Sequence, residues 1–296
     1  MQAAGAQALV DVVIINYNAG EALIRCVRSV MSQDMPIRIT VSDNASTDGS
    51  VEALERALGD VDGLSIVRNE RNLGFARGVN EVVSQMDCRA EFLLILNPDC
   101  EMRPGSLAEL VGALDLDPGA ALAGPAVIDD SGHIMRGTLR RFPDPWKSFL
   151  TFSGLTRLQR WIPAFSGVEV DARLPAGTVS AEAVSGACML IRQSAFNAID
   201  GMDSSYGLHC EDLDLMYRFR LGGFRCLYVP LARVFHEQGI SSSSRPLWVH
   251  WQKHLGMQRF FRKFQAGRRA LPVRWLVISG IWLRFALTLP LVLLRR

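Results

Sequence analysis

The stretch EFLLILNPDC, residues 91–100, is a buried-strand pattern that runs directly into a polar turn. Five apolar residues precede Asn97, Pro98 and Asp99. Proline fixes the backbone and has no N–H for a strand ladder, so we expect the strand to end here with the Asp99 carboxylate directed away from the sheet edge. Such a hard oxygen ligand suits Mg²⁺ or Mn²⁺ beside a substrate diphosphate. A turn aspartate that bonds its own backbone is the alternative at this point.

Three more strand patterns lie upstream, and helix patterns separate all four strands. We expect strands over residues 8–16, 37–44, 64–69 and 91–96, and helices over residues 20–33, 50–58 and 74–86. Ser46 or Asp48 is positioned to cap the second helix. Strands spaced by helices of this length are typical of βαβ units. The sequence therefore predicts an α/β fold with a mostly parallel central sheet and flanking helices, a Rossmann-like αβα sandwich.

Polar residues stand where these strands end, at Asn16, Asp43, Asn69 and Asp99. Because ligands bind beyond the carboxyl ends of the strands in such sheets, we expect this edge to face the ligand. Asp43 can accept a hydrogen bond from a nucleobase imide or a ribose hydroxyl, or can form an Asx turn. The segment RNLGFARGVN (71–80) places glycines at a helix start, which alone is a weak phosphate signal.

The pattern loosens over residues 118–180. DDSG (129–132) is typical of a hairpin turn, and four prolines interrupt a stretch without clear periodicity. We expect an irregular insertion that lies over the sheet. Regular patterns return as a strand and helix over residues 182–196, a helix over 211–221 that ends at glycines, and a strand over 224–230.

Acidic residues are concentrated at the start of the helix predicted over residues 211–221. Glu211, Asp212 and Asp214 lie there, where negative charge stabilises a helix, so part of this density is expected from capping alone. Their mutual repulsion can also raise one pKa and produce a useful base. Arg218, four residues after Asp214, can pair with it. His236 follows a strand; a lone histidine is more often structural than a ligand, but here it can complete a metal site or contact a phosphate.

Charge is distributed unevenly along the 296 residues. The chain has 32 basic and 30 acidic residues, but eleven basic and no acidic residues follow Glu237. The basic residues of this tail are interleaved with Trp, Phe and Leu, which favours an anionic lipid surface over nucleic acid. The six cysteines are scattered, as expected for reduced thiols in the cytosol, and the first residues show no signal-peptide pattern.

The tail combines a basic amphipathic stretch over 246–265 with an apolar one from Trp275 to Leu294. The second stretch is long enough to span a bilayer. Arg284 at its centre and Pro290 within it argue against a span. We expect a helical extension that lies on a membrane surface. Packing against the domain or against a second subunit, and a true span, are the alternatives.

Seven segments in this order resemble the inverting glycosyltransferases of family 2, which have the GT-A fold. The segments are VVIINYN (12–18), SDNASTDGS (42–50), RNLGFARGVN (71–80), LNPD (96–99), SGACMLIR (185–192), GLHCEDLDLMYRFRLGG (207–223) and FHEQGISS (235–242). The Asn-Pro-Asp and His-x-x-Gly-x-Ser forms are similar to bacterial rhamnosyltransferases, which use dTDP-rhamnose to build lipopolysaccharide, O-antigen and other cell-surface glycans.

The resemblance implies a role for individual residues. Asn16, Asn18 and Asp43 would hold the nucleoside, and Asn72, Gly74, Asn80 and Arg218 would complete the donor site. Asp99 would bind Mg²⁺ or Mn²⁺ on the diphosphate, with His236 beside it. Asp212, preceded by Glu211, would be the catalytic base. Asn97 replaces the first acid of the family's Asp-x-Asp motif, so the metal is expected to bind weakly without the donor.

The resemblance further implies a catalytic domain over residues 1–240, with a nucleotide-sugar half over about 1–117 and an acceptor half over about 118–240, before a membrane-associating segment over 241–296. We expect a cytoplasmic, peripheral membrane protein with a nucleotide-sugar donor, a glycan or glycolipid acceptor, an anionic membrane surface and no nucleic acid as its partners. The oligomeric state stays open. A UDP-hexose donor and a non-catalytic glycan- or lipid-binding member are the alternatives. A sugar nucleotidyltransferase is disfavoured, because INYNAGEAL (15–23) lacks a Gly-rich basic signature.

Overall fold

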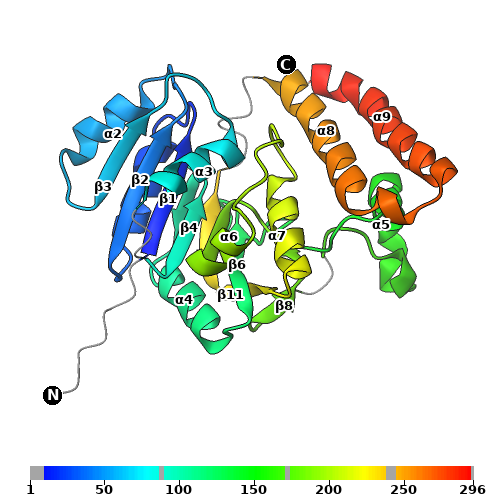
Figure 1. Cartoon of the computed structure of the whole chain (residues 1–296), viewed down its shortest axis with the longest axis horizontal. Helices are drawn as coiled ribbons and strands as arrows, with labels where there is room; N and C mark the ends of the chain where they lie inside the picture. The colour runs from blue at the N-terminus through cyan, green and yellow to red at the C-terminus, as the bar shows by residue number, and fades with distance from the viewer. Residues whose placement is uncertain (1–9, 87–89, 171–173, 238–244, 295–296) are drawn as a thin grey trace.

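The computed structural model describes residues 10–86, 90–170, 174–237 and 245–294. It shows an α/β domain built on one large sheet, with a pair of long helices at one side (Figure 1). The strands are β1 (Val10–Asn16), β2 (Ile37–Asp43), β3 (Leu64–Arg68), β4 (Phe92–Leu96), β5 (Cys100–Met102), β6 (Ala120–Ile128), β7 (Leu139–Arg140), β8 (Val179–Ala181), β9 (Ala183–Val184), β10 (Cys188–Arg192) and β11 (Arg225–His236).

The α-helices are α1 (Ala22–Met31), α2 (Ser50–Leu58), α3 (Phe75–Gln85), α4 (Ser106–Leu116), α5 (Pro145–Ser153), α6 (Gln193–Ala198), α7 (Glu211–Leu221), α8 (Pro246–Phe264) and α9 (Leu271–Leu293). Three short 3₁₀ turns are η1 (Leu155–Arg160), η2 (Pro163–Phe165) and η3 (Ala266–Arg268). Every element expected up to residue 96 is present, with ends within two residues of the prediction wherever the structure describes them.

The order of the main sheet is β3-β2-β1-β4-β10-β6-β11-β5, and β8 adds to β11. The strands β3, β2, β1, β4, β6 and β11 run in one direction, and β10, β5 and β8 oppose them. The prediction of a mostly parallel sheet is therefore confirmed. Its consequence for function is that β1, β2, β4 and β11 all end at the same edge, which brings residues from both halves of the chain together.

Alternating side chains of the central strands supply the two faces of the sheet. In β1, Val12 and Ile14 belong to one core and Val13 and Ile15 to the other. Side chains of α1, α2 and α4 cover the first face, and those of α3, α6 and α7 cover the second. Strand β4 is buried throughout, as a strand covered on both faces must be. The three layers hold the strand ends rigidly where the site is built.

Strand β6 corrects the expectation of an irregular insertion from residue 118. It is a fully buried nine-residue strand between β10 and β11. Its centre contains Gly124 and Pro125, two residues that weaken a strand pattern. The structure accommodates them through Val184, which packs where a side chain at Gly124 would lie, and a bulge in β11 between Val229 and Arg233. The irregular part begins only after Ile128.

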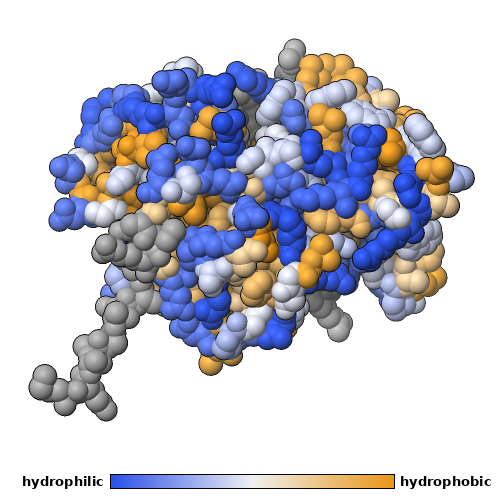
Figure 2. Space-filling view, viewed as in Figure 1, coloured by the Kyte–Doolittle hydropathy of each residue, from blue (hydrophilic) through white to orange (hydrophobic). Residues whose placement is uncertain are grey.

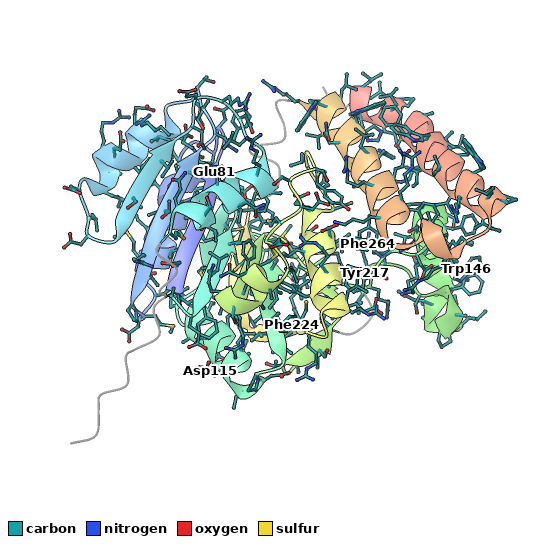
Figure 3. All side chains as sticks on the ribbon, in the orientation of Figure 1. Glu81, Asp115, Trp146, Tyr217, Phe224 and Phe264 are labelled. Atoms are coloured by element: carbon teal, nitrogen blue, oxygen red, sulfur yellow. The ribbon has the colours of Figure 1, made fainter. Side chains whose placement is uncertain are left out.

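Helix α8 packs against the α/β domain. The ring centroids of Tyr217 on α7 and Phe264 on α8 are 4.4 Å apart, and Figure 3 shows the two side chains between these helices. Phe260 of α8 is buried in the same core as α7. The carboxyl-terminal segment predicted from residue 241 is therefore joined to the domain through a shared apolar core.

Helix α9 packs on α8 through a polar seam. Arg284, at the centre of this apolar helix, lies 3.0 Å from Nε2 of buried His254 and above the ring of Phe152. Burial lowers the pKa of His254 to about 4, so at neutral pH its Nδ1–H donates to the His250 carbonyl and its Nε2 accepts from Arg284. The arginine thus faces α8, while the opposite side of α9 is left exposed.

The exposed side of α9 is largely apolar, and Figure 2 shows orange residues among white and blue ones toward the right-hand margin. By length and composition, α9 is the one helix in the described chain that could cross a membrane. Its exposed large side chains are Leu271, Val273, Trp275, Leu276, Leu283, Leu287, Leu291 and Leu293, and Leu294 directly after the helix is also exposed. Trp146 and Phe149 of α5 are also more than half exposed.

Candidate active site

The ends of β1 and β2 form a tight polar network. Asn16 is fully buried, and its Nδ2 donates to Asp43 Oδ1 at 2.7 Å and to Ser50 Oγ at 3.0 Å. The Ser46 backbone N–H donates to Asp43 Oδ2 at 3.0 Å, a local hydrogen bond that spans one residue more than the Asx turn foreseen as one alternative. Asn16 and Asp43 therefore lie together, as predicted, and each fixes the position of the other.

Asn18 extends this network to the loop before α2. It has a positive φ of 52°, and its Oδ1 accepts a hydrogen bond from the Thr47 N–H at 2.8 Å. The Asp48 side chain accepts from the Ser50 and Gly20 N–H groups. Partial burial acts to raise the pKa of Asp48, but these hydrogen bonds outweigh it and lower the pKa. Of the two predicted caps, Asp48 is the one that bonds the first residue of α2.

Asn72 and Gly74 shape the start of α3. Asn72 Oδ1 accepts from the Gly74 N–H at 2.8 Å, and Gly74 has a φ of 80° that favours glycine. Asn80 instead bonds Met202 in both directions, with its Nδ2 2.7 Å from the Met202 carbonyl and its Oδ1 2.9 Å from the Met202 N–H. The structure thus ties Asn80 to the loop before α7.

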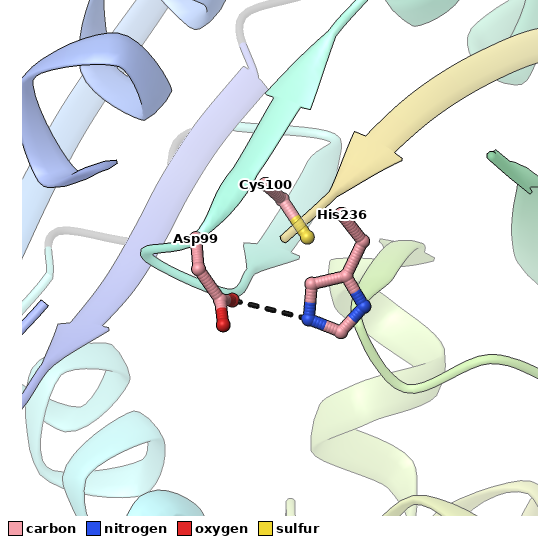
Figure 4. A group of neighbouring side chains, drawn as sticks. All are labelled: Asp99, Cys100 and His236. Carbon is pink, nitrogen blue, oxygen red and sulfur yellow. Dashed lines mark ion pairs between the residues drawn. The ribbon is translucent and has the colours of Figure 1, made fainter. Parts of the chain in front are cut away.

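Asp99 and His236 meet at the shared strand edge (Figure 4). His236 Nε2 is 3.2 Å from Asp99 Oδ1, and the Glu237 N–H donates to the Asp99 carbonyl at 3.0 Å. Asp99 Oδ1 is buried, and no hydrogen-bond donor within the described chain points at it with bonding geometry. An acceptor left in this state is suited to a cation, so the residues fit the metal that was predicted here.

Cys100 is the third potential ligand at this position. Its pairing opposite His236 in β5 and β11 places the sulfur, the Asp99 carboxylate and the imidazole within 4.8 Å of one another. Burial raises the pKa of the Cys100 thiol well above its ordinary value, and Sγ lies 3.6 Å from the Ala187 carbonyl. A protonated thiol is a poor ligand for Mg²⁺ or Mn²⁺, so Asp99 and His236 are the suitable pair.

Asp212 stands at the start of α7 and pairs with Arg140 of β7. Arg140 Nη2 donates to Asp212 Oδ2 and to the Val184 carbonyl. The Leu213 N–H donates to the other carboxylate oxygen of Asp212 at 2.8 Å. Gly186 lies against this side chain, because a Cβ there would be 2.7 Å from Asp212 Oδ2. Backbone and guanidinium therefore hold the carboxylate in one orientation.

The pKa values of the adjacent acids Glu211 and Asp212 are shifted in opposite directions. Burial acts to raise the pKa of Asp212, but the charge and hydrogen bond of Arg140 outweigh it and lower the pKa. Burial and the neighbouring Asp212 raise the pKa of Glu211 to about 8. The expectation that repulsion raises the pKa of the base is therefore corrected: Glu211 carries the raised pKa, and Asp212 is ionised at neutral pH.

Arg218 lies in a separate ion-pair network. Its Nε donates to fully buried Asp214 at 2.6 Å and its Nη1 to the Ile199 carbonyl. Lys263 of α8 reaches the other oxygen of Asp214 at 2.7 Å and also pairs with Asp203 at 2.6 Å. The pairing with Asp214 is thus observed, and it occupies Arg218 in a link between α7 and α8. Its assignment to the donor site stays a prediction, and its buried Nη2 has no hydrogen-bond partner within the described chain.

Three contributors to this site could not be assigned from the sequence. Arg140 lies in the stretch without clear periodicity, and nothing in RGTLRRF (136–142) distinguishes it from Arg141. Gly186 and Lys263 act through contacts made only in the folded chain. Residues 238–244, which carry the predicted Gly/Ser loop after His236, and Cys88 lie outside the described residues. The other five cysteines are free thiols.

Comparison with known proteins identifies a matching family and relatives, one of which aligns with most of the chain. The family model described as Glycosyl transferase family 2 matches residues 11–199. A Mycobacterium tuberculosis protein named N-acetylglucosaminyl-diphospho-decaprenol L-rhamnosyltransferase is 26% identical over 289 residues, which are 93% of this chain and 91% of that protein. Rhamnosyltransferase WbbL of Escherichia coli is 26% identical over 150 residues, 49% of this chain and 52% of its own length.

Solved structures share the fold at lower identity. A mannosyltransferase from Pyrobaculum calidifontis, in complex with GDP-Man and Mn²⁺, superposes with a TM-score of 0.59 at 15% identity, covering 97% of this chain and 76% of that one. GalNAc-T7 with UDP, GalNAc and Mn²⁺ gives a TM-score of 0.57 at 19% identity, covering 78% of this chain and 44% of that one. These likenesses show the GT-A fold.

Proposed function

The chain belongs to glycosyl transferase family 2, and from that premise we propose that it transfers L-rhamnose from dTDP-rhamnose to a hydroxyl of a lipid-linked cell-surface glycan with inversion at the anomeric carbon. The observation that carries this proposal is the pair of carboxylates, Asp99 and Asp212, one with an oxygen open to a cation and the other fixed in its ionised form. Asp99 is suited to bind a cation on the donor diphosphate, and Asp212 is suited to remove a proton from the acceptor hydroxyl.

The donor would lie across the carboxyl ends of the parallel strands. Asn16, Asn18 and Asp43 would orient the nucleoside, and Asn72 and Gly74 would form the adjoining wall. Asp99 and His236 would hold a divalent cation. That cation, when bound, neutralises charge on the departing diphosphate. The Mn²⁺ in the two GT-A neighbours supports this assignment by analogy of fold only.

Asp212 would act as the general base. Its Oδ2 is oriented by Arg140, and its ionised state at neutral pH leaves it free to take a proton. The acceptor hydroxyl gives its proton to Asp212 while its oxygen forms a bond to the anomeric carbon. The bond from that carbon to the diphosphate breaks, and the nucleoside diphosphate leaves with the electron pair. Attack from the face opposite the leaving group inverts the configuration.

Glu211 is the poorer candidate for this role. With a pKa raised to about 8 by burial, it is mostly protonated at neutral pH, and a neutral carboxyl group cannot take up the acceptor's proton. Replacing Asp212 by Asn should therefore cost about 10²-fold or more in turnover, while Glu211→Gln should cost less. The reverse order would move the base to Glu211.

Rhamnose and a lipid-linked acceptor are the finer part of the proposal. Both curated relatives described above are named rhamnosyltransferases, and the name of the mycobacterial one includes a glycosyl-diphospho-lipid. The exposed apolar side of α9 would rest on the cytoplasmic face of the membrane, where such an acceptor is found. Arg284 supports surface binding over a span, because its partners lie on α8 and α5 within the protein.

A nucleotide screen by thermal shift tests the donor assignment. The wild-type protein should be stabilised more by dTDP than by UDP or GDP, and only with Mg²⁺ or Mn²⁺ present. Asp99→Ala should lose the cation-dependent part of this shift while the melting temperature without ligand changes little. A larger thermal shift with UDP than with dTDP would identify a UDP-sugar as the donor instead. If dTDP gives the same shift in EDTA as with Mg²⁺ or Mn²⁺, the metal does not take part in donor binding.

A further inference from the structure

A cavity of about 490 Å³ lies between α8 and the loop that precedes α7. Its lining includes Tyr206 and Gly207 from the loop and Gln252, Arg259, Arg262 and Lys263 from α8. The volume is in the range of pockets that take small ligands. None of these residues belongs to the donor or base assignments made above.

The cavity is strongly basic. Arg262 and Lys263 follow Arg259 by three and four residues on α8, so both lie on the side of the helix that carries Arg259. Lys263 is committed to Asp203 and Asp214. Arg259 and Arg262 are exposed and have no ion-pair partner in the part of the chain that the structure describes; Arg259 lies 5.6 Å from the Tyr206 ring centroid. Two uncompensated guanidinium groups at one cavity favour a doubly charged anion such as a diphosphate.

The same loop joins this cavity to the donor side of the site. Gly207 is close to Gly74 at the start of α3, because a Cβ at Gly74 would lie 3.6 Å from the Gly207 carbonyl oxygen. On its other side, a Cβ at Gly207 would be 2.5 Å from Oε1 of Gln252. The loop at Gly207 therefore lies between the start of α3, which belongs to the proposed donor site, and α8.

The cavity is also linked to the base. A Cβ at Gly256 of α8 would lie 2.6 Å from the His209 carbonyl oxygen, so α8 packs directly on the backbone just before Asp212. Toward α9, the Trp282 indole N–H donates to Gln258, another residue of the cavity wall, at 2.6 Å. The basic cavity thus lies between the segment that carries the base and the helix whose apolar side is exposed.

We propose that this cavity binds the diphosphate of a lipid-linked acceptor, with Arg259 and Arg262 as its ligands. The proposal rests on the proposed function for the identity of the reaction and adds the subsite that selects the acceptor. A lipid chain leaving the cavity past α9 would reach the exposed apolar side of that helix, while the sugar on the diphosphate would extend toward Asp212. Arginine pairs are suited to a diphosphate, because each guanidinium can donate two parallel hydrogen bonds to phosphate oxygens.

Calorimetric titration of the full-length protein with a sugar-free short-chain alkyl diphosphate tests the subsite directly. EDTA in the buffer prevents a metal at Asp99 from binding the probe. Arg259→Ala/Arg262→Ala should weaken binding by about tenfold or more, and the matched Lys double variant should retain part of the affinity. Arg56→Ala/Arg103→Ala removes the same charge from exposed positions outside the cavity and should bind as the wild type does.

Each remaining outcome has a defined meaning. Equal affinity in the wild type and the Ala double variant would overturn the proposal. Unchanged diphosphate affinity together with weaker sedimentation on phosphatidylglycerol vesicles would assign the cavity to a phospholipid headgroup instead. The dTDP thermal shift and the choice of sugar do not enter this titration, so a wrong donor would leave its result intact and the two proposals can fail separately.

Discussion

Arg140 of β7 donates a hydrogen bond to Asp212 at the start of α7, and the same nitrogen also donates to the Val184 carbonyl. The two residues are 72 positions apart in the sequence. The guanidinium keeps the carboxylate ionised in a buried setting, which is the state that a general base requires. The guanidinium of Arg140, which lies in a segment without clear periodicity, therefore controls the protonation state of Asp212.

Replacing Arg140 by Met should shift the pH dependence of catalysis. Without the cation, the pKa of Asp212 rises, less of the carboxylate is ionised at low pH, and the acid limb of kcat/KM moves to higher pH. At pH 6 the loss should be about tenfold or more. Arg141→Met is the matched control, because Arg141 bonds the Gly167 carbonyl and not Asp212. If the acid limb of Arg140→Met does not move, Arg140 does not set the pKa of the group that acts as the base.

Gly186→Ala should impair turnover through contact with the base. The new Cβ would meet Asp212 Cβ and Oδ2 at 2.7 Å, so the carboxylate must move. Since small displacements of a catalytic group are costly, we expect turnover to fall by about 10²-fold while the dTDP thermal shift is kept. Gly177→Ala is the control, because nothing lies within 4 Å of its added Cβ. Normal turnover in Gly186→Ala would show that the position of Asp212 is not limiting.

Glu211 should make the stability of the protein depend on pH. Its pKa rises from 4.5 in the unfolded chain to about 8 in the fold. Between these values the folded protein keeps a proton that the unfolded chain releases, so the free energy of unfolding falls as pH rises, by at most about 1.4 kcal/mol per pH unit.

Denaturant unfolding of Glu211→Gln checks this sign. The variant cannot titrate here, so its stability should change less from pH 5 to pH 8 than that of the wild type, and it should be the more stable protein at pH 8. Glu109→Gln, on the exposed side of α4, should follow the wild type. Parallel curves for the wild type and Glu211→Gln would show that Glu211 does not hold the proton.

The part of the fold in which strands and helices alternate regularly, up to β4, could be predicted from the sequence. Apolar runs such as VVIIN (12–16) and FLLIL (92–96) alternate with helix patterns at fixed spacing, and the polar residues that end these strands necessarily share an edge. That reasoning brought Asn16 and Asp43 together and directed Asp99 away from the sheet. It failed at β6, because Gly124 and Pro125 interrupt the strand pattern, and the packing of Val184 and the bulge in β11 that accommodate them arise only in the fold.

The parts that depend on long-range contacts could not be predicted. The sequence contains 32 basic residues, and only folding selects Arg140 for Asp212 and Lys263 for Asp214. Local spacing identified the pairing of Arg218 with Asp214 but not the additional hydrogen bond from Arg218 to the Ile199 carbonyl. Arg284 stands out in the sequence as a charge within an apolar stretch, but its partner His254 emerges only from the pairing of α8 with α9.

Charge on the exposed side of α9 should release the protein from membranes. Leu276 and Leu287 are 72% and 68% exposed, and their spacing of eleven residues places them on one face of the helix. Changing both to Glu should reduce the fraction bound to anionic liposomes by about tenfold or more, since burial of each leucine contributes about 1.5–3 kcal/mol. Sedimentation with the vesicles measures this fraction.

Leu116→Glu is the control for that experiment, because Leu116 on α4 is 89% exposed and lies outside α9. It should bind liposomes as the wild type does. Unchanged binding of the α9 variant would contradict a membrane role for this surface and favour a contact with a second subunit, which the sedimentation coefficient of the free protein would then reveal.

The measurement that tests the central claim most directly is proton NMR of the product formed from dTDP-rhamnose and a short-chain glycosyl diphosphate acceptor. The account predicts a rhamnoside whose anomeric configuration is opposite to that of the donor, formed by the wild type and at least about 10²-fold more slowly by Asp212→Asn. Retention of configuration, or transfer from a UDP-hexose but not from dTDP-rhamnose, would contradict it.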